Sequence, residues 1–224
     1  MNNLVERMNN SEVFTHLKPA EREALTLTGH RKVLQAEEIL CHQGDTWPYV
    51  FWILEGQMRS YIISPDGRTF VTGVWKEGKE FWGHSLFDEK GMPSTTEAVS
   101  RTMGYLWDGE EALEVIFHNT NAVRALLRRQ TLLVRGRREI IFNLAFNPVT
   151  SRVAKLIVGL FEDAENQTVQ RELTLDEMAA RIASSPEVVC RVLHQFHASG
   201  FLDMKRATIT LHDRAALENL ISIE

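Results

Sequence analysis

The chain has 224 residues, enough for one large or two small domains, and its 44% hydrophobic and 25% charged residues are ordinary for a globular protein with buried cores. No apolar run approaches the 18 or so residues that span a membrane, and the N-terminal stretch lacks the apolar segment of a signal peptide, so we predict a cytoplasmic protein with no membrane partner. The two cysteines, Cys41 and Cys190, exclude a disulfide framework, a CxxC metal site and a four-thiolate iron–sulfur cluster within one chain.

The formal net charge of −5 is unevenly distributed along the chain. Residues 1–118 carry a net −7 and residues 149–224 a net −3, whereas residues 119–148 hold six arginines against one glutamate, a net +5. Overall acidity argues against general affinity for nucleic acid. Any contact with DNA must therefore come from a local basic patch.

The first half of the chain has the pattern of a small β-structure preceded by a helix. Residues 19–30 predict a short helix that starts at Pro19, a favoured first position. From about 31 to 107, short apolar-alternating segments are separated by glycines, and Ser64-Pro65-Asp66-Gly67 is a strong hairpin turn. This pattern predicts an antiparallel barrel or sandwich.

Two helices follow, over 108–118 and about 120–146, the second about 40 Å long. Steps of three and four residues along the second helix give an apolar seam interrupted by Gln130 and Arg137. We predict that this seam joins two subunits in a homodimer, since the six arginines leave the helix few other apolar residues to bury. The alternative is that the seam packs against the β-structure. The predicted seam residues are Val123, Leu126, Leu133, Ile140 and Leu144.

Pro148 ends the long helix and places a domain boundary near residue 147. Residues 149–161 predict another helix, and the polar stretch 162–173 has no period and predicts a loop. Thr174 and Glu177 form a capping-box pattern that opens a helix ending at Ser184.

Ser185 and Pro186 then provide the N-cap and first position of a second short helix, so the pair predicts a helix-turn-helix. The second helix has an inward apolar stripe and an outward polar face, and ends at Ser199-Gly200. The two short strands after it, with Arg206-Ala207 at the tip, predict a wing. The inward residues are Val189, Val192, Leu193 and Phe196, and the outward residues are Glu187, Cys190, Arg191 and His194.

The N-terminal part of the second helix is where a helix-turn-helix meets base edges. Arginine pairs with guanine and glutamate accepts from cytosine, so we predict base reading by Glu187, Arg191 and Cys190. The alternatives are an intrahelical Glu187–Arg191 ion pair, and for Cys190 a small groove residue or an oxidisable thiol. Contacts to the DNA backbone are predicted for Thr174, Ser184, Ser185, His194, His197, Lys205 and Arg206.

Four segments resemble the Crp/Fnr family (cyclic AMP receptor and fumarate–nitrate regulators) over nearly the whole chain. They are VFWILEGQMRSYIISPDGR at 50–68, GHSLF at 83–87, NLAFNPVTSRVAKLI at 143–157 and PEVVCRVLHQFHASGFL at 186–202. The resemblance implies an α+β fold: an antiparallel β-roll of the cyclic-nucleotide-binding type (1–118), a long dimerisation helix (119–147) and a winged helix-turn-helix (148–224). It also implies a homodimer on a palindromic double-stranded DNA site. Pro186 stands where the cyclic AMP branch has an arginine, which favours TTGA-like half-sites.

The resemblance places an effector pocket at Gly83, His84, Ser94, Thr95, Thr96, Gln130, Arg137 and Arg138. The family's cyclic-nucleotide cassette has a glutamate after the glycine and an arginine for the phosphate; here His84 follows Gly83, and residues 92–97 contain no arginine but include Glu97. This argues against cyclic AMP. A small anionic or aromatic molecule held by Arg137 or Arg138 and the aromatic residues Trp52, Trp75, Phe81 and Trp82 is favoured. Haem with His84, His42 or Cys41 as axial ligand is next, and otherwise no metal is expected. The remaining alternatives are a redox signal through a cysteine and no ligand at all.

We therefore expect an allosteric transcriptional regulator that contacts RNA polymerase if it is an activator. An enzyme is not expected, because no phosphate-binding P-loop, HExxH or GxSxG motif occurs. The remaining alternative is a ligand-binding module whose winged helix contacts protein.

Overall fold

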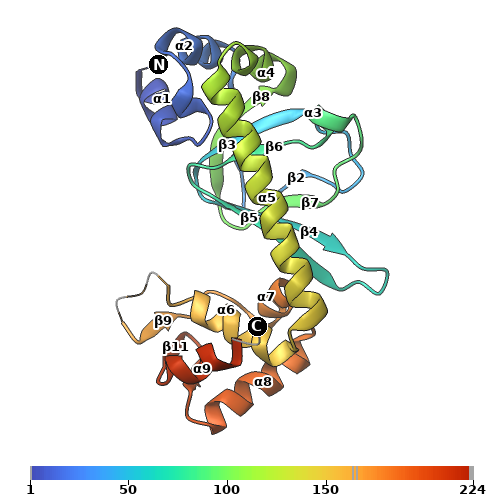
Figure 1. Cartoon of the computed structure of the whole chain (residues 1–224), viewed down its shortest axis with the longest axis vertical. Coiled ribbons are helices and arrows are strands. Elements are labelled where there is room, and N and C mark those ends of the chain that lie inside the picture. The colour runs from blue at the N-terminus through green and yellow to red at the C-terminus, as the bar shows by residue number, and fades with distance from the viewer. Residues whose placement is uncertain (1, 163, 165, 222–224) are drawn as a thin grey trace. The chain divides into compact units, whose positions relative to one another are not determined.

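The computed structural model describes residues 2–162, 164 and 166–221 (Figure 1). The chain folds into two compact units, residues 1–62 with 72–136 and residues 63–71 with 137–224. We refer to them as the first and second units. Among the described residues, none of the helices has the length and apolarity that crossing a bilayer requires.

Short helices precede the β-structure of the first unit: α1 (Asn2–Arg7), two 3₁₀ turns (Met8–Asn10 and Phe14–His16) and α2 (Pro19–Thr28). The predicted helix at Pro19 is thus confirmed. Its start is fixed by Glu21, whose Oε2 accepts a hydrogen bond from the Lys18 backbone N–H at 2.7 Å. Helix α1 and the two turns were not predicted, because these short segments show no apolar period.

Two antiparallel four-stranded sheets form the predicted β-structure, in the orders β1-β8-β3-β6 and β2-β7-β4-β5 (Figure 1). The predicted hairpin joins β4 to β5: Gly67 has φ +82°, and Ser64 and Arg68 close the turn by a 2.9 Å backbone bond. The strands are β1 (His30–Leu34), β2 (Ile39–Cys41), β3 (Tyr49–Glu55), β4 (Gln57–Ile63), β5 (Thr69–Lys76), β6 (Glu80–Trp82), β7 (Thr95–Ala98) and β8 (Thr102–Asp108); the short α3 (Ser85–Asp88) lies between β6 and β7.

The first unit has two apolar cores. One contains Phe14, Trp52 and Trp107 and joins the N-terminal helices to the sheet that contains β3 and β8. The other fills the space between the sheets with large side chains: Phe51, Met58, Trp75, Phe81 and Met92. Of the four aromatic residues predicted to share one wall, Trp75 and Phe81 therefore lie in the second core, whereas Trp52 and Trp82 lie in the first.

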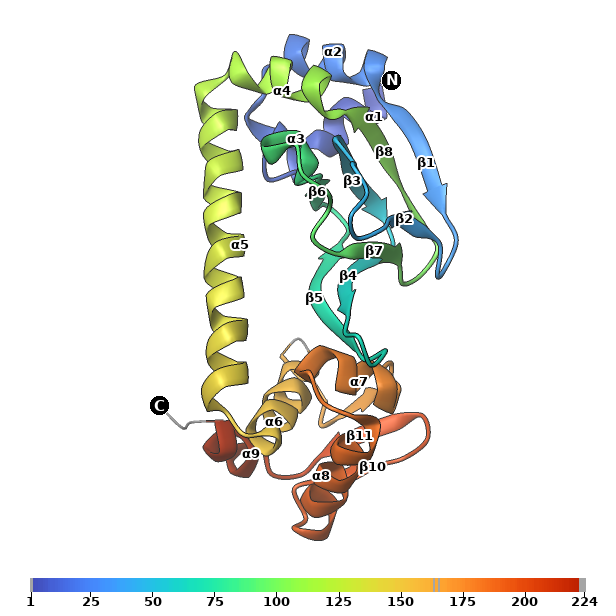
Figure 2. The ribbon, with the colours of Figure 1, turned by 90° about the vertical axis from the view of Figure 1, so that its right-hand side faces the viewer.

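The predicted helices after the barrel are confirmed as α4 (Gly109–Phe117) and α5 (Thr120–Phe146), and Figure 2 shows α5 as one unbroken helix. Asp108 caps α4 by accepting the Glu110 backbone N–H at 3.0 Å. The N-terminal half of α5 buries Ala122, Leu126 and Arg129. Most of the apolar side chains further along α5 stay exposed.

The second unit contains α6 (Val149–Gly159), α7 (Leu175–Ile182), α8 (Pro186–Ala198) and α9 (Arg214–Ile221) around one apolar core. Its small sheet has the order β10-β11-β9 with β9 (Thr168–Gln170), β10 (Leu202–Met204) and β11 (Thr208–Leu211). The two-strand wing is confirmed, but the prediction of a loop throughout 162–173 is wrong. Val169 pairs with Ile209, so residues 168–170 form a third strand that a three-residue polar segment does not signal.

Two glycine substitutions should have opposite effects on the stability of the first unit. A Cβ at Gly83 would overlap the Trp47 carbonyl oxygen, whereas a Cβ at Gly136, inside α5, meets no atom within 4 Å. We expect Gly83→Ala to lower the free energy of unfolding by about 1–3 kcal/mol and Gly136→Ala to raise it by up to about 1 kcal/mol. Urea unfolding followed by tryptophan fluorescence measures this, because all five tryptophans lie in the first unit.

Candidate nucleic-acid interface and ligand domain

The helix-turn-helix of the second unit is fixed at both ends of α7. The predicted capping box forms: Thr174 Oγ1 accepts the Glu177 backbone N–H at 3.2 Å, and Glu177 Oε2 accepts the Thr174 N–H at 2.8 Å. At the other end Ala183 adopts left-handed φ and ψ of 51° and 59°, which turns the chain toward α8. Arg152 of α6 donates to the Ile182 carbonyl and ties the turn to the core.

Helix α8 presents its polar face as the sequence predicts. Val189, Val192, Leu193 and Phe196 are buried in the core of the second unit. Glu187, Arg191 and His194 are exposed, and Cys190 is half-buried. Pro186 occupies the first helical turn, but Ser185 makes no side-chain cap bond to the backbone.

Ser185 instead acts on Glu187. A hydrogen bond from the Ser185 side chain is the main cause that holds the pKa of Glu187 below its ordinary value. No ion pair joins Glu187 to Arg191 in the described part of the chain. The simpler alternative of an intrahelical ion pair is therefore not the arrangement found.

A groove of about 360 Å³ lies between α8 and the wing. Its basic lining residues come from three segments, and apolar side chains and Cys190 line the rest. Arg171 was missed in the sequence because it lies in the stretch that we interpreted as a loop; its backbone N–H donates to the Ala207 carbonyl at 2.8 Å. The basic residues are Arg171, His194, His197, Lys205 and Arg206.

Two of the predicted backbone-contacting residues also have structural partners. Thr174 caps α7, and His197 Nδ1 lies 2.9 Å from Asp203 Oδ1 in the wing. His212 Nε2 lies 3.0 Å from the other oxygen of Asp203, and this contact is the main reason that the pKa of Asp203 is lowered. Asp203 thus links the end of α8 to the wing. Ser184 and Ser185 are half-buried in the turn.

Two of the side chains predicted for the effector pocket already have hydrogen-bond partners within the protein, and a third is buried. Thr96 Oγ1 contacts Ser60 Oγ at 2.8 Å, and Ser60 Oγ accepts from Trp75 Nε1 at 3.0 Å. Thr95 Oγ1 accepts the Gln43 backbone N–H at 3.0 Å, and Ser94 is buried.

The remaining pocket positions differ in exposure. Gly83 is buried against Trp47, whereas His84 and Arg138 are exposed. Gln130 and Arg137 are half-buried, and burial lowers the pKa of Arg137. These positions stay predicted effector contacts.

The region where the family's cassette has its phosphate-binding arginine contains an acid in this chain. Residues 92–97 contain no arginine for a phosphate and include the buried Glu97. Glu97 Oε1 accepts a hydrogen bond from Arg59 Nε at 2.7 Å. The charge of Arg59 is thus already compensated, and an added phosphate would face a carboxylate. Large apolar side chains lie between the sheets, and the polar atoms of Ser60, Thr96 and Trp75 are hydrogen-bonded to one another.

The residues proposed for haem ligation differ in burial. Burial raises the pKa of Cys41 to about 11, which disfavours the thiolate that binds iron. His42 and His84 are exposed. No group of three metal-ligating side chains occurs within residues 2–162, 164 and 166–221.

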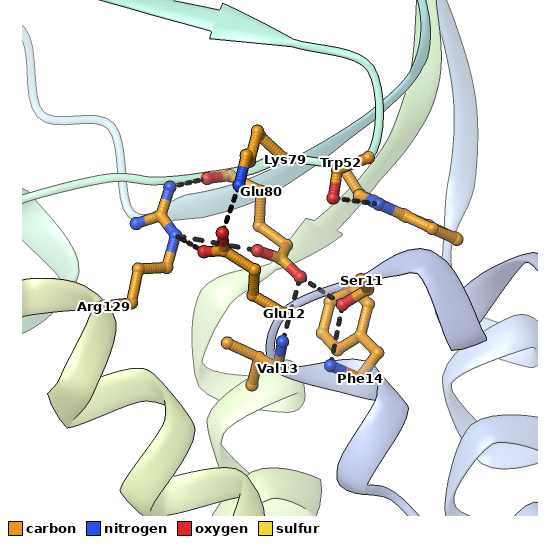
Figure 3. Close-up of polar contacts among 9 residues, drawn as sticks. Ser11, Glu12, Val13, Phe14, Trp52, Lys79, Glu80 and Arg129 are labelled. Carbon is orange, nitrogen blue, oxygen red and sulfur yellow. Dashed lines mark hydrogen bonds and ion pairs between the residues drawn. The ribbon is translucent and has the colours of Figure 1, made fainter.

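The buried ionic cluster shown in Figure 3 was not predicted from the sequence. Glu80 on β6 is fully buried; its Oε1 accepts from the Ser11 hydroxyl and, at 3.2 Å, from the Val13 backbone N–H. Arg129 of α5, only 6% exposed, donates to the Glu80 carbonyl, and its Nε lies 3.6 Å from Glu80 Oε2. Its guanidinium lies 5.3 Å from the Trp75 ring centre.

This cluster decides which face of α5 is covered by the first unit. Leu126, one turn before Arg129, is 4% exposed in the first core, and Val123 and Leu133 pack against the same unit. Leu126 is thus already covered by the chain's own core, whereas Val123 and Leu133 are only partly buried and stay predicted seam residues. Ile140 is half-buried and Leu144 is 39% exposed.

A different set of apolar residues on α5 is uncovered. Leu127, Val134 and Ile141 are 62%, 69% and 66% exposed and recur every seven residues. That repeat places them on one face of the helix. We call them the exposed stripe.

Two family models match the chain. One is described as a cyclic nucleotide-binding domain and matches residues 31–119, and the other is a Crp-like helix-turn-helix domain and matches residues 151–220. The cAMP-activated global transcriptional regulator Vfr of Pseudomonas aeruginosa is 24% identical, with 81% of this chain and 89% of that protein covered.

The fumarate and nitrate reduction regulatory protein of Escherichia coli K12 is also 24% identical, over 85% of this chain and 78% of that protein. Among solved structures, the c-di-GMP responsive global regulator CLP of Xanthomonas campestris superposes with a TM-score of 0.76 at 19% identity, covering 87% of this chain and 99% of that one.

The two cysteines should differ sharply in reactivity. At pH 8 a thiol with a pKa of about 11 is ionised in only about one molecule in a thousand, and Cys41 is buried as well. We expect iodoacetamide to add one adduct to the native chain, at Cys190, and two after unfolding in denaturant. Intact mass and peptide mapping measure this, with Cys190→Ser as the control. Modification of Cys41 in the native chain would contradict its burial.

Proposed function

Since the chain belongs to the Crp/Fnr family of transcriptional regulators and carries that family's DNA-binding helix-turn-helix, we propose that it acts as a homodimer that reads a palindromic site through α8. The observation that carries this proposal is the exposed pair Glu187 and Arg191 at the start of α8, unpaired with each other and next to the basic groove. A carboxylate beside phosphates is electrostatically costly unless it contacts a base.

The roles of the two side chains follow from their hydrogen-bonding chemistry. Arg191 donates two parallel hydrogen bonds to a guanine, and Glu187 accepts from a cytosine amino group. The Ser185 side chain hydrogen-bonds the Glu187 carboxylate and so restrains it at the start of α8. The half-buried Cys190 lies between them and contacts a base edge by packing.

Contacts with the phosphates come from the groove and the wing. Arg171, Lys205 and Arg206 supply charge, and His194 supplies a donor at the groove edge. These contacts set the register and carry little sequence information. Arg171 is an addition to the residues that the sequence indicated.

The exposed stripe on α5 supports a parallel pairing of two copies. Three large aliphatic side chains at a spacing of seven residues are the pattern that a two-helix interface buries. Such a dimer would present two α8 helices to half-sites about one helical turn of DNA apart, with TTGA-like half-sites favoured by Pro186.

The effector is proposed to be a molecule other than cyclic AMP. The pairing of Glu97 with Arg59 and the filled space between the sheets support this. A small anionic or aromatic molecule remains the favoured class over haem, because Cys41 is held as a thiol. Contact with RNA polymerase follows if the protein is an activator.

Substitution of Arg191 should relax sequence specificity. We expect Arg191→Ala to weaken binding to the cognate duplex by about 1–3 kcal/mol, with the loss concentrated at one base pair of each half-site. Lys205→Ala should weaken all sequences to the same extent and lower the salt dependence of binding by about one charge.

Fluorescence anisotropy with duplexes changed at single positions, over a range of salt concentrations, measures both effects. Equal loss on every duplex for Arg191→Ala would contradict its assigned role. Binding of the wild type that does not fall with rising salt would favour the alternative in which the winged helix contacts protein.

A charge in the exposed stripe should separate the dimer. We expect Val134→Glu to give a monomer in sedimentation or native mass spectrometry, because a carboxylate would be buried between two helices. Leu132→Glu is the matched control: Leu132 is 55% exposed on the same helix but lies about 160° around the axis from Val134. Dissociation by both variants, or by neither, would exclude the stripe as the interface.

A further inference from the structure

A basic groove of about 600 Å³ lies on the first unit, outside the barrel and between α5 and the segment that precedes α2. Three arginines of α5 line it, and among the described residues of its lining Glu12 is the only acid. Residues 121, 124/125, 128/129 and 132 follow one side of the helix over about three turns. The lining residues are Glu12, His16, Asn121, Arg124, Ala125, Arg128, Arg129 and Leu132.

The charges around this groove do not balance. Glu12 is shared by Lys79 and Arg129, and Glu80 is held by Arg129 (Figure 3). Arg124 and Arg128 are exposed and form no ion pair with any described residue. The two carboxylates are thus compensated by Lys79 and Arg129, and two guanidinium groups one helical turn apart remain without a counter-charge.

The base of the groove is closed by a compensated ion pair. Arg129 is only 6% exposed, and its Nε lies 3.6 Å from Glu80 Oε2 and 3.7 Å from Glu12 Oε2. The charge of Arg129 is therefore balanced within the protein, and the positive charge that remains for a ligand is that of Arg124 and Arg128.

The groove is also distinct from the surface that we assign to the second subunit. At 100° per residue, Arg128 lies about 120° around α5 from Val134 of the exposed stripe and about 160° from the buried Leu126. It is equally distinct from the predicted effector positions Arg137 and Arg138, which are about two turns further along the helix. Arg124 is closer, about 60° around the axis from Leu127, so the groove borders the stripe but contains none of its residues.

We propose that this groove is a binding site for a small organic anion with at least two negative charges, such as a phosphate ester or a polycarboxylate. Guanidinium groups bind both through paired N–H donors. Arg124 and Arg128 hold the charged oxygens, and Ala125 and Leu132 line the apolar part. This proposal concerns ligand binding to the first unit, so it does not depend on whether α8 reads DNA.

Calorimetric titration of the full-length protein, without DNA and at constant ionic strength, tests the site. The probes are pyrophosphate for the phosphate class and citrate for the carboxylate class, with acetate as the singly charged control. We expect saturable binding of at least one probe, a rise in the thermal midpoint of the first unit, and at least tenfold weaker binding of acetate. Saturation by pyrophosphate alone or citrate alone identifies the class, and saturation by neither overturns the proposal.

Two variants locate the site on the chain. Arg124→Gln with Arg128→Gln should weaken the bound probe at least tenfold. Arg135→Gln, on the same side of α5 but outside the groove, should change it less than twofold. Because all three arginines are exposed, these variants are expected to fold, and circular dichroism checks this.

Equal loss in the double variant and in Arg135→Gln would show a diffuse charge effect and overturn the proposal. The arginines have a different partner, an acidic surface of a second copy, if both probes and the double variant shift the chain from dimer to monomer. That outcome also overturns the proposal. Loss of DNA binding by Arg191→Ala is an independent readout, so failure of the anion site and failure of the proposed function are distinguishable.

Discussion

The burial of Glu80 and Arg129 is the constraint from which the arrangement of the first unit follows. Removing two charges from water is unfavourable. Their mutual attraction offsets this desolvation cost only where further hydrogen bonds satisfy the two charged groups. Ser11 and Val13 supply two bonds to the Glu80 carboxylate, and the Glu80 carbonyl accepts from Arg129. The pair therefore holds the N-terminal segment, strand β6 and helix α5 together, and loss of Arg129 would leave the fully buried Glu80 without an opposite charge among the described residues.

Fixing Arg129 against β6 also fixes the rotation of α5 about its own axis. Leu126 and Leu133 lie on the same side of the helix as Arg129 and are covered by the first unit, which leaves Leu127, Val134 and Ile141 outside. A helix with six arginines and apolar residues on more than one side thus has a defined core face, a basic groove and an aliphatic stripe. Ligand binding at one of these surfaces can bias the others only through a change in how α5 packs.

The sequence predicted most elements because their signals are local. Gly67 requires a left-handed turn, Thr174 and Glu177 cap each other, and Pro186 marks a helix start, so the hairpin and the helix-turn-helix followed without knowledge of distant contacts. The orientation of α5 did not follow, because heptad spacing fits both the buried Leu126 and the exposed Leu127 and only tertiary packing chooses between them. Residues 168–170 and the pairing of Glu80 with Arg129 depend on partners about 40 or more positions away along the chain.

The packing of the barrel does not depend on the predicted effector positions. Gly83 lies at the start of the family's cyclic-nucleotide cassette, yet here its lack of a side chain is required by the Trp47 carbonyl, which is a matter of packing. Trp75, Phe81 and Met58 fill the space between the sheets without reference to any effector. Ligand choice rests instead on a few polar positions, and in this chain one of them, Glu97, already has Arg59 as its partner. The apolar core therefore determines the fold of the barrel, and the charges of a few polar side chains determine which ligand charges it can accept.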